Sequence, residues 1–334
     1  MNTKMPVDCV VALTYRCNAR CTMCDIWKIK DSPELTLADL EKLPNSLRDI
    51  NLSGGEPFLR TDLPEIVATI KKSCPKARLV ISTNGFLTSV IAKVMPKILK
   101  IAPDIGVAFS IDGIGSMHDE MRGIPGGFDK VTASVKALKD MGMTNLRLAF
   151  TISEYNTNHF GKVYDLAQKL GVQFTHSFAQ SSEFYFGGKQ NINIPRRDLL
   201  ETAYKHIIGS ELKSWNMKRW ARAFFADGMF RFITSKNPVL DNAPGREFFF
   251  LDPSGDIYPS VVHNVILGNI RQVGNFAKFW NSSSVEEQRK KVDELQVPVW
   301  MVCTARTAIM RHPFAVGFWI LKNKIFGYEN CISK

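Results

Sequence analysis

Residues 7–24 of this chain read VDCVVALTYRCNARCTMC and join a short apolar run to three closely spaced cysteines. The run Val7–Thr14 is rich in β-branched and aliphatic residues, a composition typical of a buried β-strand. The cysteines that follow are Cys17, Cys21 and Cys24. On a strand Cys24 would face the opposite side from Cys17 and Cys21, and we expect instead a loop that wraps a ligand.

Further strand-like runs follow at regular intervals and alternate with segments of helical period. The predicted strands are Val7–Thr14, Asp49–Ser53, Arg78–Ser82, Ile105–Ile111, Asn145–Thr151 and Val172–Ser177. Apolar residues at spacings of three or four predict helices over 128–138 and 160–170, closed by Gly142 and Gly171. This alternation predicts an α/β fold, a partial (β/α)6 TIM-like barrel, with its chemistry at the C-terminal ends of the strands.

The pattern changes after about residue 180. A polar, Gly-rich loop is expected over Ser181–Gln190, and helices over Arg196–Ser210 and Glu211–Phe232. Two short β runs, Arg246–Asp252 and Asp256–Val262, flank Pro253-Ser254-Gly255 and predict a β-hairpin. We therefore expect a core over residues 1–185 and a smaller C-terminal α+β extension over residues 186–334 that covers the substrate.

Composition excludes several classes of protein. With 334 residues, 45% apolar and 22% charged, the chain is neither disordered nor fibrous. Seven cysteines, an odd and unevenly spread number, fit a reducing compartment better than a secreted disulfide framework. No signal peptide and no apolar stretch of ~20 residues is visible, so we expect a cytoplasmic protein. The net charge of +11 favours anionic partners or reflects solvated Lys-rich helix faces.

The cysteine triplet predicts a site for a soft metal: zinc, Cu(I) or an iron–sulfur cluster. An iron–sulfur cube has four irons, so three cysteines leave one iron open to a substrate or cofactor. The alternative is a zinc knuckle that borrows a fourth ligand such as His176. Spacing alone leaves both interpretations open. Arg16 and Arg20 flank the cysteines and are expected to stabilise thiolates.

The triplet, at this place after the first strand, resembles the signature of the radical SAM superfamily. The resemblance implies that Cys17, Cys21 and Cys24 bind a [4Fe–4S] cluster whose open iron is chelated by S-adenosylmethionine (SAM). It further implies reductive cleavage of SAM to a 5′-deoxyadenosyl radical that abstracts a hydrogen atom. In that family the residue before the last cysteine is usually aromatic and lies by the adenine; here it is Met23.

Polar residues at later strand ends extend the resemblance. In Ser53-Gly54-Gly55-Glu56-Pro57, Gly54 and Gly55 let backbone approach a ligand, and Glu56 is expected to accept hydrogen bonds from the SAM amino group. The other predicted SAM contacts are Ser82, Asn84, Ser110, Asp112 and Arg122. A helix N-cap is the alternative for the Ser82–Gly85 segment, and ordering of a turn is the alternative for Asp112. His118 is expected to be structural, and no residue is assigned as catalytic.

The stretch from Asn242 to Ser260 is similar to the start of a SPASM or twitch extension. That pattern would place cysteines at Asn242, at Ser260 and near Val299, but only Cys303 and Cys331 remain in this part of the chain. Since an auxiliary cluster usually needs four thiolates, we expect a SPASM-like scaffold without most of the auxiliary-cluster cysteines, and an auxiliary Fe–S cluster is doubtful.

The sequence constrains the substrate less than the cofactors. The chain begins close to its first strand, which leaves no room for a leader-peptide domain and favours a small, sugar-like or lipid-linked substrate. The alternatives are a peptide-modifying SPASM-type maturase and, from another class, a zinc-binding basic RNA-binding module. An electron donor such as flavodoxin or ferredoxin is expected.

Two aromatic segments have a structural and a functional interpretation. The apolar run from Arg311 to Lys324 is expected to form a helix that packs on the barrel or lies at a membrane interface as a peripheral contact. The segment from Trp215 to Phe232 is interpreted as core or pocket lining rather than a stacking platform, so no nucleic acid partner is expected.

Overall fold

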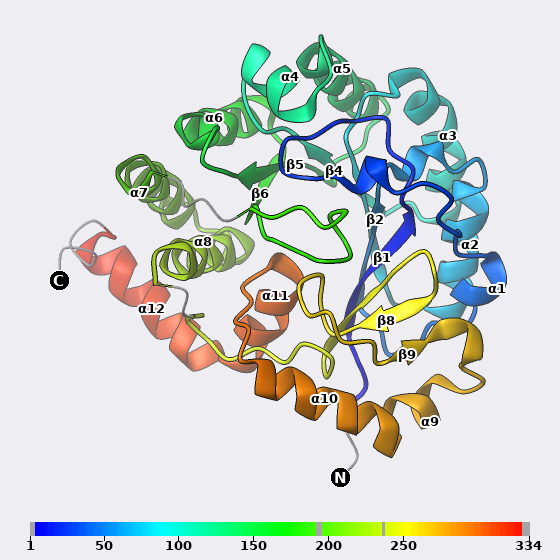
Figure 1. Cartoon of the computed structure of the whole chain (residues 1–334). Coiled ribbons are helices and arrows are strands. Elements are labelled where there is room, and N and C mark those ends of the chain that lie inside the picture. The colour runs from blue at the N-terminus through cyan, green and yellow to red at the C-terminus, as the bar shows by residue number, and fades with distance from the viewer. Residues whose placement is uncertain (1–3, 192–195, 236–237, 329–334) are drawn as a thin grey trace.

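A single curved sheet forms the centre of the computed structural model, which describes residues 4–191, 196–235 and 238–328 (Figure 1). Its parallel part consists of β1 (Asp8–Thr14), β2 (Asp49–Gly54), β3 (Arg78–Thr83), β4 (Gly106–Ser110), β5 (Leu146–Ile152) and β6 (Gln173–Phe178). These strands are neighbours in chain order, from β6 at one edge to β1. The predicted strands and the partial (β/α)6 barrel are confirmed.

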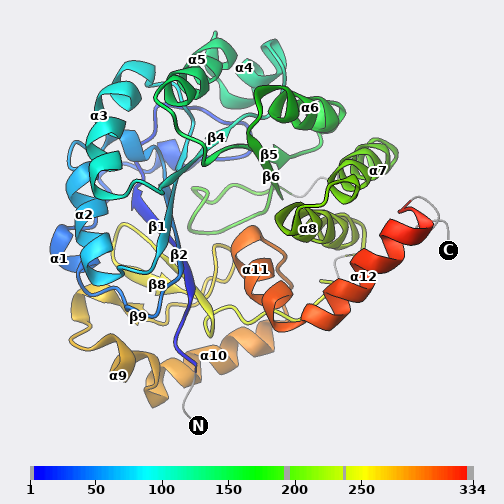
Figure 2. The same ribbon diagram turned by 180° about the vertical axis from the view of Figure 1, so that it is seen from behind.

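Helices cover the outer face of this sheet (Figures 1 and 2). They are α1 (Leu37–Leu40), α2 (Leu63–Ser73), α3 (Thr88–Ile101), α4 (Ser116–Arg122), α5 (Gly127–Asp140) and α6 (Phe160–Leu170). Short 3-10 helices are η1 (Ile26–Lys28), η2 (Pro57–Leu59), η3 (Thr157–His159) and η4 (Ile270–Gln272). As predicted, α6 buries Phe160, Val163 and Ala167 and ends at Gly171, whose φ of 65° is left-handed.

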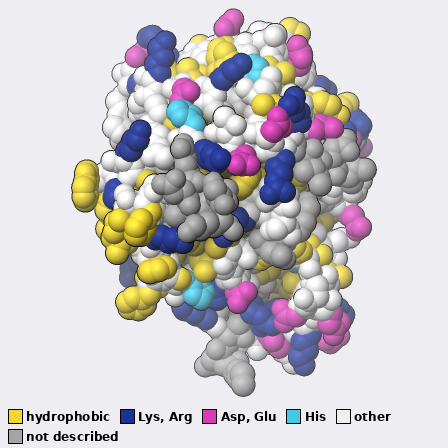
Figure 3. All heavy atoms as spheres, turned by 90° about the vertical axis from the view of Figure 1, so that its left-hand side faces the viewer, with side chains coloured by type: hydrophobic (Ala, Val, Ile, Leu, Met, Phe, Trp, Pro, Cys, Tyr) yellow, Lys and Arg dark blue, Asp and Glu magenta, His cyan; other side chains and the backbone are white. Residues whose placement is uncertain are grey.

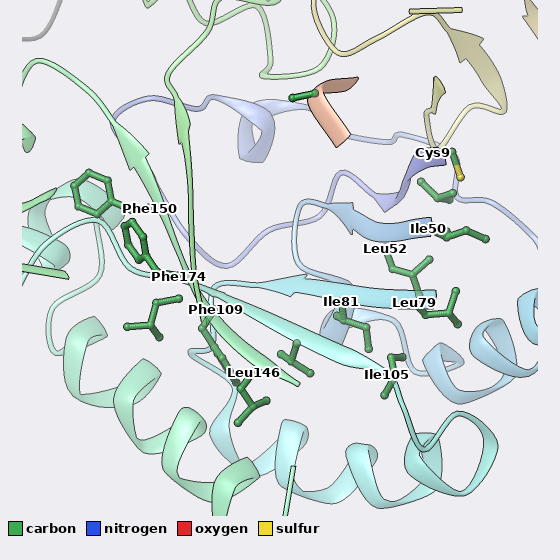
Figure 4. Close-up of a cluster of buried hydrophobic side chains, with 14 of the residues drawn as sticks. Cys9, Ile50, Leu52, Leu79, Ile81, Ile105, Phe109, Leu146, Phe150 and Phe174 are labelled. Carbon is green, nitrogen blue, oxygen red and sulfur yellow. The ribbon is translucent and has the colours of Figure 1, made fainter. Parts of the chain in front are cut away.

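The core lies between the strands and these helices. Figure 4 shows Ile50 and Leu52 of β2 beside Leu79 and Ile81 of β3, with Phe109 and Leu146 further along the sheet. All of these side chains are buried. The opposite faces of the same strands point into the barrel, so each strand supplies the core with one set of residues and the barrel interior with the alternate set.

The C-terminal part extends the same sheet beyond β1. The strands are β7 (Phe248–Leu251), β8 (Asp256–Tyr258) and β9 (Gly268–Asn269). The expected hairpin is present as the antiparallel pair β7–β8. Unexpectedly, β7 also pairs parallel with β1, so that Asp8 lies opposite Phe248. The segment Phe-Phe-Phe-Leu of β7 is buried throughout, as is usual for a strand covered on both faces.

The remaining helices belong to the C-terminal part of the chain, and two of them lie across the open side of the barrel (Figure 2). The C-terminal helices are α7 (Arg197–Lys213), α8 (Met217–Ser235), α9 (Phe276–Trp280), α10 (Ser283–Leu295), α11 (Val302–Arg311) and α12 (Pro313–Phe326). Helix α8 packs against β6 and α11 against β1, across the gap that six strands leave (Figure 2). Within the described part of the chain no helix is both long and apolar enough to cross a membrane.

The helix expected over Glu211–Phe232 is wrong at its start. Glu211 belongs to the end of α7, and the chain is extended at Ser214 before α8 begins at Met217. The side chain of Asn216 accepts a hydrogen bond from the backbone N–H of Lys218 at 2.9 Å and so caps the new helix. The extended backbone at Ser214 and the cap at Asn216 therefore divide this stretch into two helices.

Candidate functional site

The loop after β1 carries the three cysteines and is held against the end of α4. The backbone N–H of Arg20 donates to the carbonyl oxygen of Arg122 at 2.9 Å, and that of Thr22 donates to the carbonyl oxygen of Met121 at 2.9 Å. The three thiols form no disulfide and are partly buried. Two backbone hydrogen bonds thus fix the loop at the C-terminal edge of the sheet.

A cavity of about 280 Å³ lies beside this loop. Cys17, Cys21 and Cys24 all line it, together with polar residues from the ends of five strands. Among these are Ser53, Ser82, Ser110, Thr151 and Ser177. Because the carboxyl ends of parallel strands meet at one edge of a sheet, residues far apart in the chain converge here, as the barrel topology predicts.

The backbone at the end of β2 approaches β1 closely. Gly54 has a φ of +117°, and a Cβ at Gly54 or Gly55 would collide with the backbone of Thr14 or Arg16. The N–H of Gly55 donates to the carbonyl oxygen of Thr14 at 2.7 Å. Glycine is therefore required here both for its conformation and for space, and the two residues present bare backbone to the cavity.

Glu56 lies behind the cavity rather than on its wall. Its carboxylate accepts hydrogen bonds from the N–H of Phe58 (3.1 Å), the hydroxyl of Thr83 (2.8 Å) and the N–H of Asn84 (2.8 Å). The side chain is fully buried, and burial raises its pKa to about 7 against the lowering effect of these donors. In the structure the Glu56 oxygens hold the ends of β2 and β3 together, and its contact with the SAM amino group stays a prediction.

Arg122 and Asp112 form an ion pair beside the thiols. The guanidinium Nη2 of Arg122 lies 2.5 Å from Asp112 Oδ2, and Nη1 donates to Cys21 Sγ at 3.5 Å. Burial lowers the pKa of Arg122, but Asp112 and Cys21 more than compensate and hold it raised. Asp112 is fully buried and also accepts a hydrogen bond from the N–H of Thr151 at 2.7 Å. It therefore positions Arg122 and is not among the residues that line the cavity, and its contact with SAM stays a prediction.

The structure places the other predicted residues on the cavity wall. They are Met23, Gly54, Gly55, Ser82, Asn84, Ser110 and Arg122. Ser82 donates to Asn51 and Asn84 donates to Asn18, so both are oriented by neighbours. His118 is buried and accepts a hydrogen bond from the N–H of Asp112 at 3.2 Å, in keeping with the structural role expected for it.

Sequence reasoning missed Ser53, Thr151, Ser177, Gln180 and Tyr185, which also line the cavity. The first three lie at strand ends and follow from the strand-end rule. Tyr185 comes from the expected loop, and its hydroxyl lies 3.3 Å from the hydroxyl of Ser53. Gln180 Oε1 is buried and has no hydrogen-bond partner among the described residues. A buried acceptor in a cavity wall is a point at which a bound molecule can donate a hydrogen bond.

The donor set fits a group larger than one ion. Among the described residues no three His, Cys, Asp or Glu side chains converge on a single-ion site, although the thiols share one cavity. Burial raises the pKa of Cys17 to about 11 and that of Cys24 to about 12, and it also raises the pKa of Cys21. Thiols of this kind ionise when a soft metal binds them.

His176 does not lie on the cysteine-lined cavity. It is buried and packs against the rings of Phe160, Phe174, Tyr204 and Phe225. Burial lowers its pKa to about 3. The zinc knuckle with His176 as fourth ligand is therefore wrong. Arg16 pairs with Glu34, and Arg20 donates to the backbone carbonyl oxygens of Cys17 and Ala19.

A second cavity of about 270 Å³ lies in the barrel interior. It shares Ser53, Ser82, Ser177, Gln180 and Tyr185 with the first cavity, so the two adjoin. The end of this cavity away from the cysteine loop is charged. It is lined by Asp8, Asp49, Arg78 and Arg147 at or near the strand starts and by Arg306 of α11. Arg306 lies 2.5 Å from Asp49 and 3.3 Å from Asp8. The two cavities therefore run from the cysteine loop to this group of charges.

Hydrogen bonds occupy the positions where auxiliary-cluster cysteines would be expected. The side chain of Asn242 donates to the carbonyl oxygen of Val299, and the hydroxyl of Ser260 lies 2.8 Å from His263 Nδ1. Cys303 lines the barrel-interior cavity, whereas Cys331 lies outside the described residues. A side-chain-to-backbone hydrogen bond thus joins Asn242 to the segment at Val299, whereas the partner of Ser260 lies three residues away in the chain.

Comparison with known proteins gives a consistent result. A family model described as the radical SAM superfamily matches residues 11–167. The chain is 35% identical over 303 residues to the pre-heme d1 synthase of Dinoroseobacter shibae, covering 80% of this chain and 71% of that protein. It is 25% identical over 298 residues to the mycofactocin maturase MftC of Mycolicibacterium smegmatis, covering 84% and 71%.

Solved structures show the same fold. Streptococcus suis SuiB bound to S-adenosylmethionine has a TM-score of 0.61 at 14% identity, covering 85% of this chain and 68% of that one. Native anSMEcpe with bound AdoMet and a Cp18Cys peptide has a TM-score of 0.63 at 16% identity, covering 96% and 99%. At these identities the likeness concerns the fold.

Proposed function

This chain belongs to the radical SAM superfamily, and from that premise we propose that it abstracts a hydrogen atom from a small, sugar-like or lipid-linked molecule held in the barrel interior. The observation that carries the proposal is the interior cavity, which adjoins the cysteine-lined cavity through five shared polar residues. A substrate placed there would lie next to the cofactor site.

The proposed cofactor site is built from the loop after β1. Cys17, Cys21 and Cys24 would hold the [4Fe–4S] cluster that the superfamily uses with SAM. When bound, the pair supplies a one-electron reductive cleavage of the sulfonium. Gly54 and Gly55 support this assignment, because they line the same cavity as the cysteines and offer a ligand backbone without a side chain.

The remaining site residues would bind and orient SAM. Arg122, held by Asp112, presents a fixed guanidinium suited to a carboxylate. Met23 is buried against Met121 and Ala179 and would pack on the adenine ring. Ser82, Asn84 and Ser110 offer hydroxyl and amide groups at the strand ends. Glu56 would act indirectly, by fixing the backbone of Asn84.

The extension would form the substrate wall, and the division into residues 1–185 and 186–334 belongs to this proposal. Helix α11 would supply part of that wall on the open side of the barrel, where its Arg306 and Cys303 line the interior cavity. An external one-electron donor, such as a flavodoxin or ferredoxin, would reduce the cluster.

A tetrapyrrole is a second candidate substrate. The 35% identity over 80% of this chain to a pre-heme d1 synthase favours it, and the Arg-containing end of the cavity would suit its carboxylates. A peptide substrate, the remaining alternative, is supported by the 25% identity to a mycofactocin maturase.

The test is anaerobic reconstitution followed by assay of iron, sulfide and 5′-deoxyadenosine. We expect about four irons per added cluster and reductant-dependent 5′-deoxyadenosine formation. Stimulation of that product by sugar or lipid-linked compounds would support the proposal. Stimulation only by a porphyrin, or only by a peptide, would transfer the assignment to that class, and no SAM cleavage with a loaded cluster would refute it.

A further inference from the structure

Helix α12 is apolar on two opposite faces. Its inner face buries Val316 and half-buries Trp319 against the protein. Its outer face carries Phe314, Phe318, Leu321 and Ile325, at spacings of four, three and four residues. Phe314 is 91% exposed and Phe318 is 71% exposed. A helix that is apolar all round normally has apolar surroundings on both faces, and the described chain supplies only one.

The turn between α7 and α8 continues this outer face. Trp215 is 87% exposed and Met217 is 73% exposed. Lys324 Nζ donates to the carbonyl oxygens of Leu212 (2.6 Å) and Ser214 (3.1 Å) and lies 4.7 Å from the Trp215 ring centroid. The turn and α12 therefore form one surface, here termed the α12 surface: Trp215, Met217, Phe314, Phe318, Leu321 and Ile325.

Basic residues surround the α12 surface. Neither residues 212–226 nor residues 297–328 contain an Asp or Glu, whereas together they contain Lys213, Lys218, Lys322 and Lys324. The four arginines of these stretches form ion pairs with acidic residues elsewhere in the chain. At about 100° per residue, Lys322 and Lys324 fall on either side of the exposed stripe of α12. Figure 3 views the side of the molecule on which α7 and α12 lie and shows hydrophobic side chains gathered beside Lys and Arg.

We propose that the α12 surface docks on an anionic lipid bilayer. Phe314 and Phe318 enter the boundary between headgroups and acyl chains, Trp215 lies at headgroup depth, and Lys218 and Lys322 contact anionic headgroups. A second copy of the chain fits this surface less well. A two-fold contact through it would bring two basic rims together, and like charges across an interface repel.

The surface also adjoins a route toward the barrel interior. Met310, in the turn of α11 next to α12, lines an apolar cavity of about 230 Å³ bounded by β6, α7, α8 and α11. That cavity shares Thr175, His176 and Arg306 with the barrel-interior cavity. Docking through α12 therefore brings a membrane close to an apolar entrance of the protein.

The experiment is cosedimentation of the full-length, reconstituted protein with vesicles. One set contains equal parts of phosphatidylglycerol and phosphatidylcholine, and the other contains phosphatidylcholine alone. We expect binding to the anionic set that weakens at high salt, and little binding to the neutral set. The double variant Phe314→Gln, Phe318→Gln should reduce partitioning at least tenfold, and Lys322→Glu should reduce it severalfold.

The matched control is Tyr155→Gln, Leu295→Gln, which removes two other exposed apolar side chains outside the α12 surface. It should bind vesicles as the unchanged protein does. Unstimulated SAM cleavage should be the same in all variants, because none alters a residue that lines the cysteine cavity. Failure of the unchanged protein to bind anionic vesicles, or equal binding by the Phe variant, would overturn the proposal. So would a dimer in sedimentation velocity that the Phe variant dissociates.

Discussion

Arg122 links Asp112 to Cys21, two residues that lie 91 positions apart in the chain. Its guanidinium contacts Asp112 on one side and the thiol of Cys21 on the other. Its backbone carbonyl receives a hydrogen bond from the cysteine loop. A lysine could supply the charge but not the planar fork, so the orientation of this side chain depends on arginine.

The three thiols should be needed together for the cluster. Replacing Cys21 with Ala leaves two local thiolates, so we expect loss of the bound iron and of its visible absorbance, with SAM cleavage abolished. The matched control is Cys74→Ala, which removes a buried core thiol distant from the cavity wall. Iron assay after anaerobic reconstitution distinguishes the two variants, and full iron in Cys21→Ala would contradict the assignment.

Glu56 should affect SAM binding through the backbone it holds. In Glu56→Gln an amide NH2 faces backbone donors, so activity at limiting SAM should fall roughly tenfold or more while iron content is retained. Because burial raises the pKa of Glu56 to about 7, lowering the pH from 8 to 6 protonates the carboxylate and should weaken SAM binding.

The Gln variant should lack that pH dependence. Glu65→Gln, which alters an exposed glutamate in the first turn of α2, is the control and should behave as the unchanged protein. Binding of SAM measured by equilibrium dialysis at pH 6 and 8 makes the comparison. Identical profiles for Glu56→Gln and the unchanged protein would show that Glu56 has no positioning role.

At the residue scale, sequence reasoning located the cavity wall better than the residues behind it. The strand-end rule identified Ser82, Asn84 and Ser110, because position along a parallel strand determines which residues meet at the edge. It did not separate wall residues from Glu56 and Asp112. That distinction depends on which hydrogen bonds the side chains make, and these bonds come from segments distant in sequence.

At the scale of elements, local patterns predicted most of the fold. Strands β1 to β6 and helices α5 and α6 follow from apolar period and from glycine at the helix ends. The parallel pairing of β7 with β1 could not be predicted, because both strands are short apolar runs that fit several partners. The break between α7 and α8 was missed because it depends on capping by Asn216.

The junction of β1 and β2 should tolerate no side chain at residue 54. In Gly54→Ala the φ of +117° is strained and the new Cβ meets the carbonyl of Thr14. We expect destabilisation by about 1–3 kcal/mol and poorer cluster loading. The control is Gly274→Ala, where a Cβ meets nothing within 4 Å. Thermal unfolding and iron content test both variants, and unchanged values for Gly54→Ala would contradict the requirement for glycine at residue 54.

At the scale of the whole molecule, the barrel contains charged residues at the end where its strands begin. Asp8 and Asp49 begin β1 and β2, and Arg306 reaches them from α11. Burial raises the pKa of Asp8 to about 7, which Arg306 partly opposes. The extension thus neutralises acidic groups at the start of the sheet, and it couples the two halves of the chain electrostatically.

That coupling predicts a pH-dependent stability. The folded state keeps a proton on Asp8 up to about pH 7, whereas the unfolded chain loses it near pH 4, so this group makes stability fall as the pH rises between these values. Asp8→Asn should remove that contribution. Relative to the unchanged protein, the variant should gain about 2 kcal/mol between pH 5.5 and 8. Denaturant unfolding at both pH values tests this, and a constant difference would contradict it.

The pairing of Asp8 with Phe248 also has a consequence for synthesis on the ribosome. One edge of β1 finds its partner β2 early, but the other edge stays uncovered until residue 251 has emerged. An uncovered edge can recruit other strands and so promotes aggregation. The nascent chain therefore carries β1 with one unpaired edge through most of translation, and the barrel-interior cavity, whose wall includes residues 261, 301–303 and 306, is completed late.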